Sequence, residues 1–189
     1  MVDRISALAG HYKTGKFGLL KDGEKAGVIL EEVKNLELHQ IAAWPDTLDA
    51  VGQQAAKTAG GDSAPGPCLA AVGKQATLLR IEPLKWWLLG AEAPAVDAEN
   101  GNTLDLSHSR SRLRIAGADA ATFLNRHLSL DLRESSFPVG SVASTAIHHV
   151  GVTLWRSAEG YELFIPRGFA LTLWEGFIES AEQFGLEVI

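Results

Sequence analysis

Apolar and polar positions alternate most regularly in the second half of the chain. Leu113 and Ile115 are interleaved with Arg112 and Arg114, and this period of two predicts a half-buried strand with a basic outer face. Toward the end, apolar residues recur at spacings of three and four over residues 168–184, which predicts a long closing helix. A shorter helix is predicted from 119 to about 127, with strands at 141–148, 151–156, 161–165 and 186–189.

The first half contains shorter elements. Alternation between residues 28 and 43 predicts one or two strands, and the apolar spacing after Asp46 predicts a helix that stops at Gly60. Short strands are predicted at 68–72, 76–81 and 86–89. The expected fold class is therefore α+β, with two small units that each carry an antiparallel sheet.

Breaks in these patterns give the expected domain organisation. It consists of an extended N-terminal arm at 1–27, a first α+β unit at 28–90, a linker at 91–102 and a second α+β unit at 103–189. The arm is rich in glycine and has almost no periodicity, so it cannot bury enough of itself to offset its ordering entropy. It is either a disordered tail or an arm that lies on a partner, with Tyr12 and Phe17 as anchors.

The adjacent tryptophans Trp86 and Trp87 fall on a predicted strand. Neighbouring residues of a strand point to opposite faces. One ring should therefore lie in the core and the other should meet a helix or a partner.

Composition and charge exclude several classes of function. The net charge of −6 argues against nucleic acid or an anionic membrane as the main partner. No apolar run has the length of a membrane span, and the first residues do not look like a signal peptide. A single cysteine, Cys68, excludes an internal disulfide, and we expect a buried thiol in a cytoplasmic protein.

The basic residues are unevenly distributed. All lysines lie at or before Lys85, whereas most arginines lie between Arg110 and Arg167. Because arginine is enriched in protein interfaces and lysine is depleted there, the second half either presents its surface to another protein or shows a chance bias. The interface residues that we predict are Tyr12, Phe17, Arg110, Arg112, Arg114 and Trp155.

Searches for chemistry give mostly negative results. No glycine-rich dinucleotide fingerprint and no P-loop occurs. His148 and His149 are expected to point to opposite faces of a strand, which disfavours a shared metal ion. Asp105, Ser107 and His108 superficially suggest a hydrolytic triad, but triad groups converge from separate elements. Local hydrogen bonding to the backbone is the expected role of Asp105 and Ser107.

The run from Asp105 through Ser107 and His108 resembles the start of the folate-binding domain of aminomethyltransferases, the T-protein of glycine cleavage. The likeness continues through Gly117, residues 123–124, Asp131 and Gly140 to Trp174 and residues 184–187. It covers roughly the last 85 residues of the chain. It implies that this half has the fold of that domain.

Most of the chain is more similar to the gamma subunit of heterotetrameric sarcosine oxidase. The stretches that carry this likeness are residues 6–10, 83–89, 105–110 (the motif Asp105, Ser107, His108 and Arg110) and 165–170 followed by 173–174. The resemblance implies partners, namely alpha and beta flavoprotein subunits and a small zinc-binding delta subunit. It also implies that FAD, FMN, NAD, zinc and tetrahydrofolate belong to those partners.

One departure from the aminomethyltransferase pattern affects the expected role. That family has an aspartate on the strand after a glycine-containing hairpin, where it contacts folate. The matching residues 149–156 contain no carboxylate, and Thr153 cannot transfer protons in its place. We therefore expect no catalytic, cofactor or metal site in this chain. It would stabilise an oxidoreductase that demethylates sarcosine or a similar N-methyl amino acid. The alternatives are a folate-binding aminomethyltransferase-like protein and the small subunit of an N-methylglutamate dehydrogenase complex.

Overall fold

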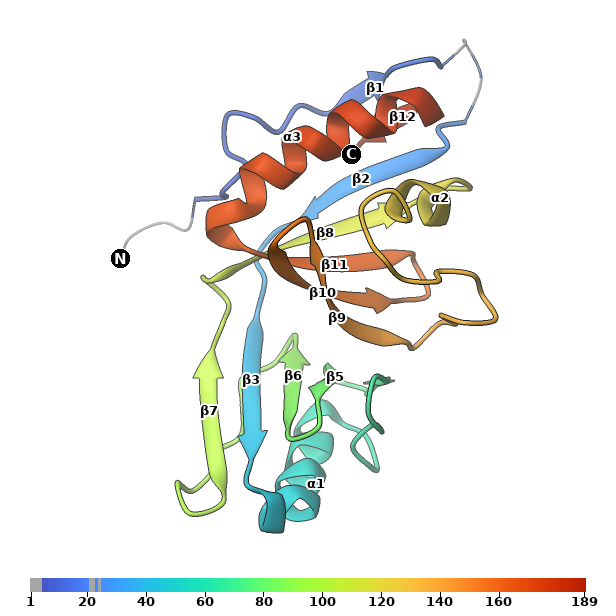
Figure 1. Cartoon of the computed structure of the whole chain (residues 1–189). Coiled ribbons are helices and arrows are strands. Elements are labelled where there is room, and N and C mark those ends of the chain that lie inside the picture. The colour runs from blue at the N-terminus through green and yellow to red at the C-terminus, as the bar shows by residue number, and fades with distance from the viewer. Residues whose placement is uncertain (1–4, 21–22, 24) are drawn as a thin grey trace. The chain divides into compact units, whose positions relative to one another are not determined.

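The computed structural model describes residues 5–20, 23 and 25–189, which fold as two compact units (Figure 1). Unit 1 comprises Met1–Lys34, Arg110–Val139 and Thr145–Ile189, and unit 2 comprises Asn35–Ser109 and Gly140–Ser144. The expected boundaries at 28, 91 and 103 therefore differ from this division, because residues 28–33 pair with strands of the second half of the chain.

Unit 1 is built on a seven-stranded sheet. Its order is β1 (Gly15–Phe17), β12 (Leu186–Val188), β2 (Val28–Val33), β8 (Arg110–Ala116), β11 (Tyr161–Pro166), β10 (Val150–Arg156) and β9 (Val142–Ile147). The pair β12–β2 is parallel, and the pairs β1–β12, β2–β8, β8–β11 and β10–β11 are antiparallel. The predicted alternation of β8 is confirmed, since Leu113 and Ile115 are fully buried between half-buried arginines.

Two helices complete unit 1. They are α2 (Ala120–Leu124) and α3 (Ala170–Ala181), and α3 is flanked by the 3-10 turns Arg167–Phe169 and Glu182–Phe184. The inner side of α3 buries Trp174 and Phe177, and the ring of Phe177 meets Phe123 of α2 edge to face at 5.6 Å. The closing helix is thus confirmed, although α3 itself ends at Ala181, and Gly185, with a φ of 70°, caps the 3-10 turn that follows it.

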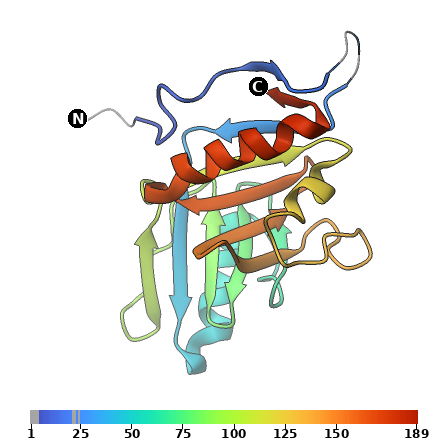
Figure 2. The ribbon, with the colours of Figure 1, turned by 45° about the horizontal axis from the view of Figure 1, so that its top comes forward.

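The N-terminal arm lies along its own unit (Figure 2). Leu8 is fully buried, and β1 pairs with β12. At Gly18, a Cβ atom would lie 2.0 Å from the backbone oxygen of Glu182, so only glycine permits this approach. The described part of the arm is therefore packed on its own unit, on surface that comes largely from the other end of the chain. Its predicted contact with a partner stays a prediction.

Unit 2 is a five-stranded antiparallel sheet covered by one helix. The order is β4 (Ala70–Val72), β5 (Thr77–Glu82), β6 (Lys85–Leu89), β3 (Leu38–Ala43) and β7 (Gly101–Asp105). The helix α1 (Leu48–Ala59) follows the 3-10 turn Pro45–Thr47 and packs on Ile41, Leu78 and Trp86. Gly52 lets α1 come close, because a Cβ there would lie 3.2 Å from the indole of Trp86. Trp87, on the opposite face of β6, is also buried.

Three short segments differ from the sequence predictions. His148 and His149 form the turn between β9 and β10, with a φ of 52° at His148, and do not extend a strand. Cys68 is exposed and has a φ of 60°, so the expectation of a buried thiol is wrong. The expected linker is structured at its end, since Gly101 and Asn102 belong to β7.

Candidate functional site

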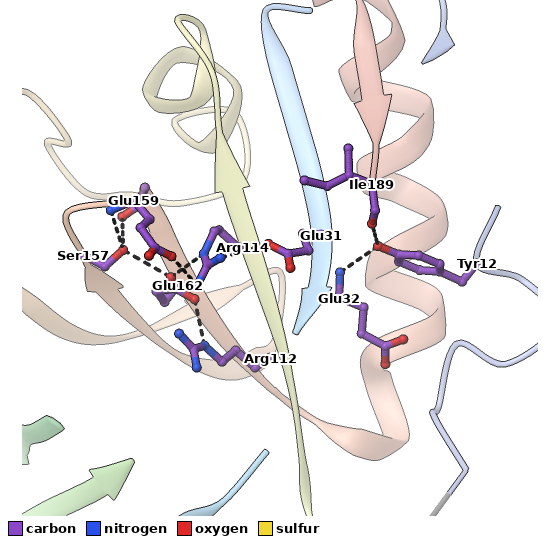
Figure 3. Close-up of polar contacts among 10 residues, drawn as sticks. Tyr12, Glu31, Glu32, Arg112, Arg114, Ser157, Glu159, Glu162 and Ile189 are labelled. Atoms are coloured by element: carbon purple, nitrogen blue, oxygen red, sulfur yellow. Dashed lines mark hydrogen bonds and ion pairs between the residues drawn. The ribbon is translucent and has the colours of Figure 1, made fainter. Parts of the chain in front are cut away.

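A network of charged side chains occupies one face of the sheet in unit 1 (Figure 3). The register places Arg114 of β8 opposite Glu162 of β11, with Arg112 two positions along the same face. The Nε atoms of Arg112 and Arg114 each lie 2.8 Å from a different carboxylate oxygen of Glu162. The side chain of Glu162 is fully buried, and the guanidinium groups of Arg112 and Arg114 neutralise its charge.

Further polar groups complete this network. The hydroxyl of Ser157 donates to Oε1 of Glu162 at 3.1 Å. Arg114 also pairs with Glu31 at 3.0 Å and with Glu159 at 2.6 Å. Burial alone lowers the pKa of Arg114, but the hydrogen bond and charge of Glu162, with the charges of Glu31 and Glu159, raise its pKa overall. Arg114 is therefore a cation that pairs with three carboxylates.

This network limits what the predicted interface arginines can offer a partner. The side chains of Arg112 and Arg114 retain 15% and 23% of their exposure, and both are ion-paired within the unit. Arg110 is half-buried, and burial lowers the pKa of its guanidinium. An interface role for these residues stays a prediction. Sequence patterning identified the arginine face and missed Glu162 and Ser157, because only the strand register reveals which acid lies opposite.

The family motif at residues 105–110 forms a local turn in unit 2. Oδ1 of Asp105 accepts the backbone N–H of Ser107 at 2.8 Å, and hydrogen bonds from Ser107 lower the pKa of that carboxyl. Oγ of Ser107 accepts the N–H of Leu38 at 3.0 Å. His108 is exposed. The predicted hydrogen bonding of Asp105 and Ser107 to the backbone is confirmed.

The strand expected to lack a folate-contacting carboxylate is β10. It carries Thr153, which is buried, and Trp155, which lies opposite Glu162 in the register. Glu162 is therefore the carboxylate that the register places opposite β10. Both of its oxygens already accept guanidinium hydrogen bonds, so it is not free to exchange a proton with a ligand. Neither β10 nor its ladder partner Glu162 therefore offers a free acid for the proton transfer that folate chemistry would need.

The remaining predicted anchors hold the arm to unit 1. The ring of Tyr12 stacks on Trp174 with 5.1 Å between centroids. Its hydroxyl donates to the backbone oxygen of Ile189 and accepts the N–H of Glu32, the latter at 2.9 Å. Burial raises the pKa of this phenol. Phe17 is half-buried in β1, and Trp155 is 6% exposed, so much of each predicted anchor is already covered by the chain itself.

No group of three or more His, Cys, Asp or Glu side chains in the part of the chain that the structure describes could hold a metal ion. No helix in residues 5–20, 23 and 25–189 has the length and apolar character to cross a membrane.

Comparisons with known proteins identify the family. No model of a protein family matches the chain. The sarcosine oxidase subunit gamma of Corynebacterium sp. (strain U-96) is 31% identical over 153 residues, which covers 77% of this chain and 74% of that protein. The chain belongs to the sarcosine oxidase gamma-subunit family. The gamma subunit of Arthrobacter sp is 33% identical over 91 residues, which cover 48% of this chain and 45% of that relative's length.

Solved structures agree with this membership of the gamma-subunit family. Heterotetrameric sarcosine oxidase from Corynebacterium sp. U-96, in complex with pyrrole 2-carboxylate, contains a chain that matches with a TM-score of 0.72 and 25% identity, covering 83% of this chain and 85% of that one. The aminomethyltransferase T of the glycine cleavage system from Bartonella henselae matches with a TM-score of 0.58 and 15% identity, over 87% of this chain and 48% of that one. The second match shows a shared fold, so the expected α+β class is confirmed.

Proposed function

We propose that this chain is the non-catalytic gamma subunit of a heterotetrameric sarcosine-oxidase-type complex, in which it stabilises the assembly. The observation that carries the proposal is the alignment over 153 residues with a sarcosine oxidase gamma subunit. The structural match to a chain of a heterotetrameric sarcosine oxidase supports it. The complex would oxidatively demethylate sarcosine or a similar N-methyl amino acid.

The internal pairing of the polar groups supports a non-catalytic role. Both oxygens of Glu162 are bound by arginines, and Ser107 is bound to the backbone of Leu38. No residue described in the site combines exposure with a free acid or base in a cleft, as proton transfer would require. The proposed division of labour gives flavins, NAD and folate to alpha and beta subunits and zinc to a small delta subunit.

Purification of the native assembly tests this proposal. The chain is tagged in its source organism and passed over a size-exclusion column, with absorbance recorded at flavin wavelengths. We expect it to elute with larger flavin-containing subunits and with sarcosine oxidation in the same fractions. Elution of the chain alone, colourless and separate from that activity, would contradict the proposal.

A further inference from the structure

The five-stranded sheet of unit 2 ends in a strand with an open edge. In the order β4-β5-β6-β3-β7, the strand β7 has a neighbour on one side only (Figure 1). An open strand edge presents a row of backbone N–H and C=O groups that another strand can pair with.

The hydrogen bonds show which groups of β7 point outward. The N–H of Leu106 donates to the oxygen of Leu38, and the oxygen of Asn100 accepts the N–H of Trp44. Even-numbered residues therefore face β3, and odd-numbered residues face away because the direction alternates along an antiparallel strand. Among the described residues, no hydrogen bond is recorded for the outward backbone groups of Thr103 and Asp105.

The side chains of β7 do not protect this edge. Exposed edges in natural proteins are usually blunted by lysine, proline or a bulge. The five residues Gly101–Asp105 include neither lysine nor proline, and their register with β3 is regular. Leu104 is 54% exposed on this strand. Leu104 therefore adds one exposed apolar side chain between the outward backbone groups of Thr103 and Asp105, with which a strand can pair.

The charge around this edge has one sign. Residues 91–105 contain the exposed acids Glu92, Asp97, Glu99 and Asp105 and neither lysine nor arginine. The hydrogen bonds of Asp105 with Ser107 keep its carboxyl ionised, since they lower its pKa. A strand that carries basic residues would be attracted to this edge, whereas a second copy of the same acidic edge would be repelled.

We propose that the outer edge of β7 is a docking site for a β-strand of a partner subunit. The incoming strand extends the five-stranded sheet of unit 2 by pairing with the backbone of Thr103 and Asp105. It places an apolar side chain beside Leu104 and lysine or arginine beside the acidic segment at 91–105. This inference rests on the proposed function, because it needs an assembly in which other subunits are present.

Hydrogen exchange of the isolated chain and of the purified complex tests the pairing directly. The amides of Thr103 and Asp105 should exchange at least about tenfold more slowly in the complex, because they become hydrogen-bonded there. The amides of Asn102 and Leu104 face β3 in both samples and serve as internal references. Equal rates at 103 and 105 in the two samples would overturn the proposal.

Variants give a second measurement with matched controls. Thr103→Pro removes an outward N–H, whereas Thr103→Val keeps it and has a similar size. Leu104→Lys places a charge on the edge without touching the core, and its control Val72→Lys alters β4, where Val72 is 75% exposed. Thr103→Pro and Leu104→Lys should each lower the yield of co-purified partner about tenfold, and both controls should leave it unchanged.

The outcomes separate this inference from the proposed function. If the Leu104→Lys variant assembles normally and the amides of residues 103 and 105 exchange no more slowly in the complex, the proposal of a partner strand on β7 is overturned. The gamma-subunit role is then left intact. Failure of the unaltered chain to co-purify with any flavoprotein overturns both. If the amides of residues 103 and 105 become protected as the concentration of the isolated chain rises, the occupant is a second copy of this chain. That result overturns the proposal of a strand from a partner subunit.

Discussion

Glu162 is the residue on which the polar face of unit 1 depends. It is fully buried and lies between Arg112 and Arg114, so each of its oxygens is neutralised by a guanidinium. A buried ion pair contributes little net stability compared with an apolar pair, but the loss of one member leaves the other charges without a partner. Substitutions at Glu162 should therefore cost more than substitutions at the exposed acids around it.

Glu162→Gln is predicted to lower the free energy of unfolding by about 3 kcal/mol, because two arginines lose their shared carboxylate. Urea unfolding followed by tryptophan fluorescence measures the change. Glu159→Gln is the matched control, since Glu159 pairs with the same Arg114 but is 65% exposed. The control should cost less than about 1 kcal/mol. Equal effects of the two variants would show that burial of Glu162 does not matter.

His127 gives unit 1 a dependence on pH. Its Nε2 lies 2.8 Å from the hydroxyl of Ser180, and its ring packs against Phe123 and Phe177. Burial lowers the pKa of His127, with smaller contributions from the charges of His148 and Arg126. The unfolded chain therefore binds a proton more readily than the folded chain does, and stability rises with pH between the two pKa values.

We predict that the unfolding midpoint falls as pH drops below about 6.5, the ordinary histidine pKa, and levels off below the folded pKa. His127→Gln should flatten this slope, whereas His149→Gln, at an exposed turn, should keep it. Thermal unfolding followed by circular dichroism between pH 5 and pH 8 measures both slopes. A slope that is unchanged in His127→Gln would assign the effect to another group.

At the level of elements, the N-terminal arm is fixed by contacts to distant parts of the sequence. Tyr12 joins the carbonyl of Ile189 to the N–H of Glu32 and stacks on Trp174. Local patterning could not reveal this, because the arm has almost no periodicity of its own. By contrast, the period of α3 and the alternation of β8 are local signals, and both elements were predicted from them.

Tyr12→Phe is predicted to lower the free energy of local opening of the arm by about 1 kcal/mol. The ring can still stack on Trp174, but the N–H of Glu32 and the carbonyl of Ile189 lose their hydrogen bonds to the hydroxyl. Amide exchange over residues 8–17 should quicken, and the amide of Glu32 should lose protection. Lys16→Ala serves as the control, since that side chain is exposed on β1. Unchanged exchange in Tyr12→Phe would mean that stacking alone holds the arm.

At the level of the whole molecule, the sequence indicated the fold class and the family but not the division into units. Residues 28–33 were expected in the first unit, yet β2 pairs with β8 and β12 of the second half. Pairings between strands that are far apart in the sequence leave no local signal. The open edge of β7 was missed for a related reason, since residues 101–102 were assigned to the linker.

The isolated chain is predicted not to bind tetrahydrofolate. Glu162, the carboxylate opposite β10 in the register, is occupied by two arginines, so a folate nitrogen would find no free acid there. Isothermal titration with tetrahydrofolate should give no heat beyond dilution. The titrated chain should first give a folded circular dichroism spectrum. Micromolar binding would favour the alternative of a folate-binding aminomethyltransferase-like protein.

The position of β12 between β1 and β2 sets an order of events during synthesis. Until residues 186–188 have been synthesised, the backbone of Gly15–Phe17 lacks the strand with which it forms hydrogen bonds. Residues 15–17 must therefore wait for residues 186–188, and β2 can meanwhile pair only with β8. A messenger cut shortly before the codon for Leu186 would leave a product in which residues 15–17 stay open to proteases.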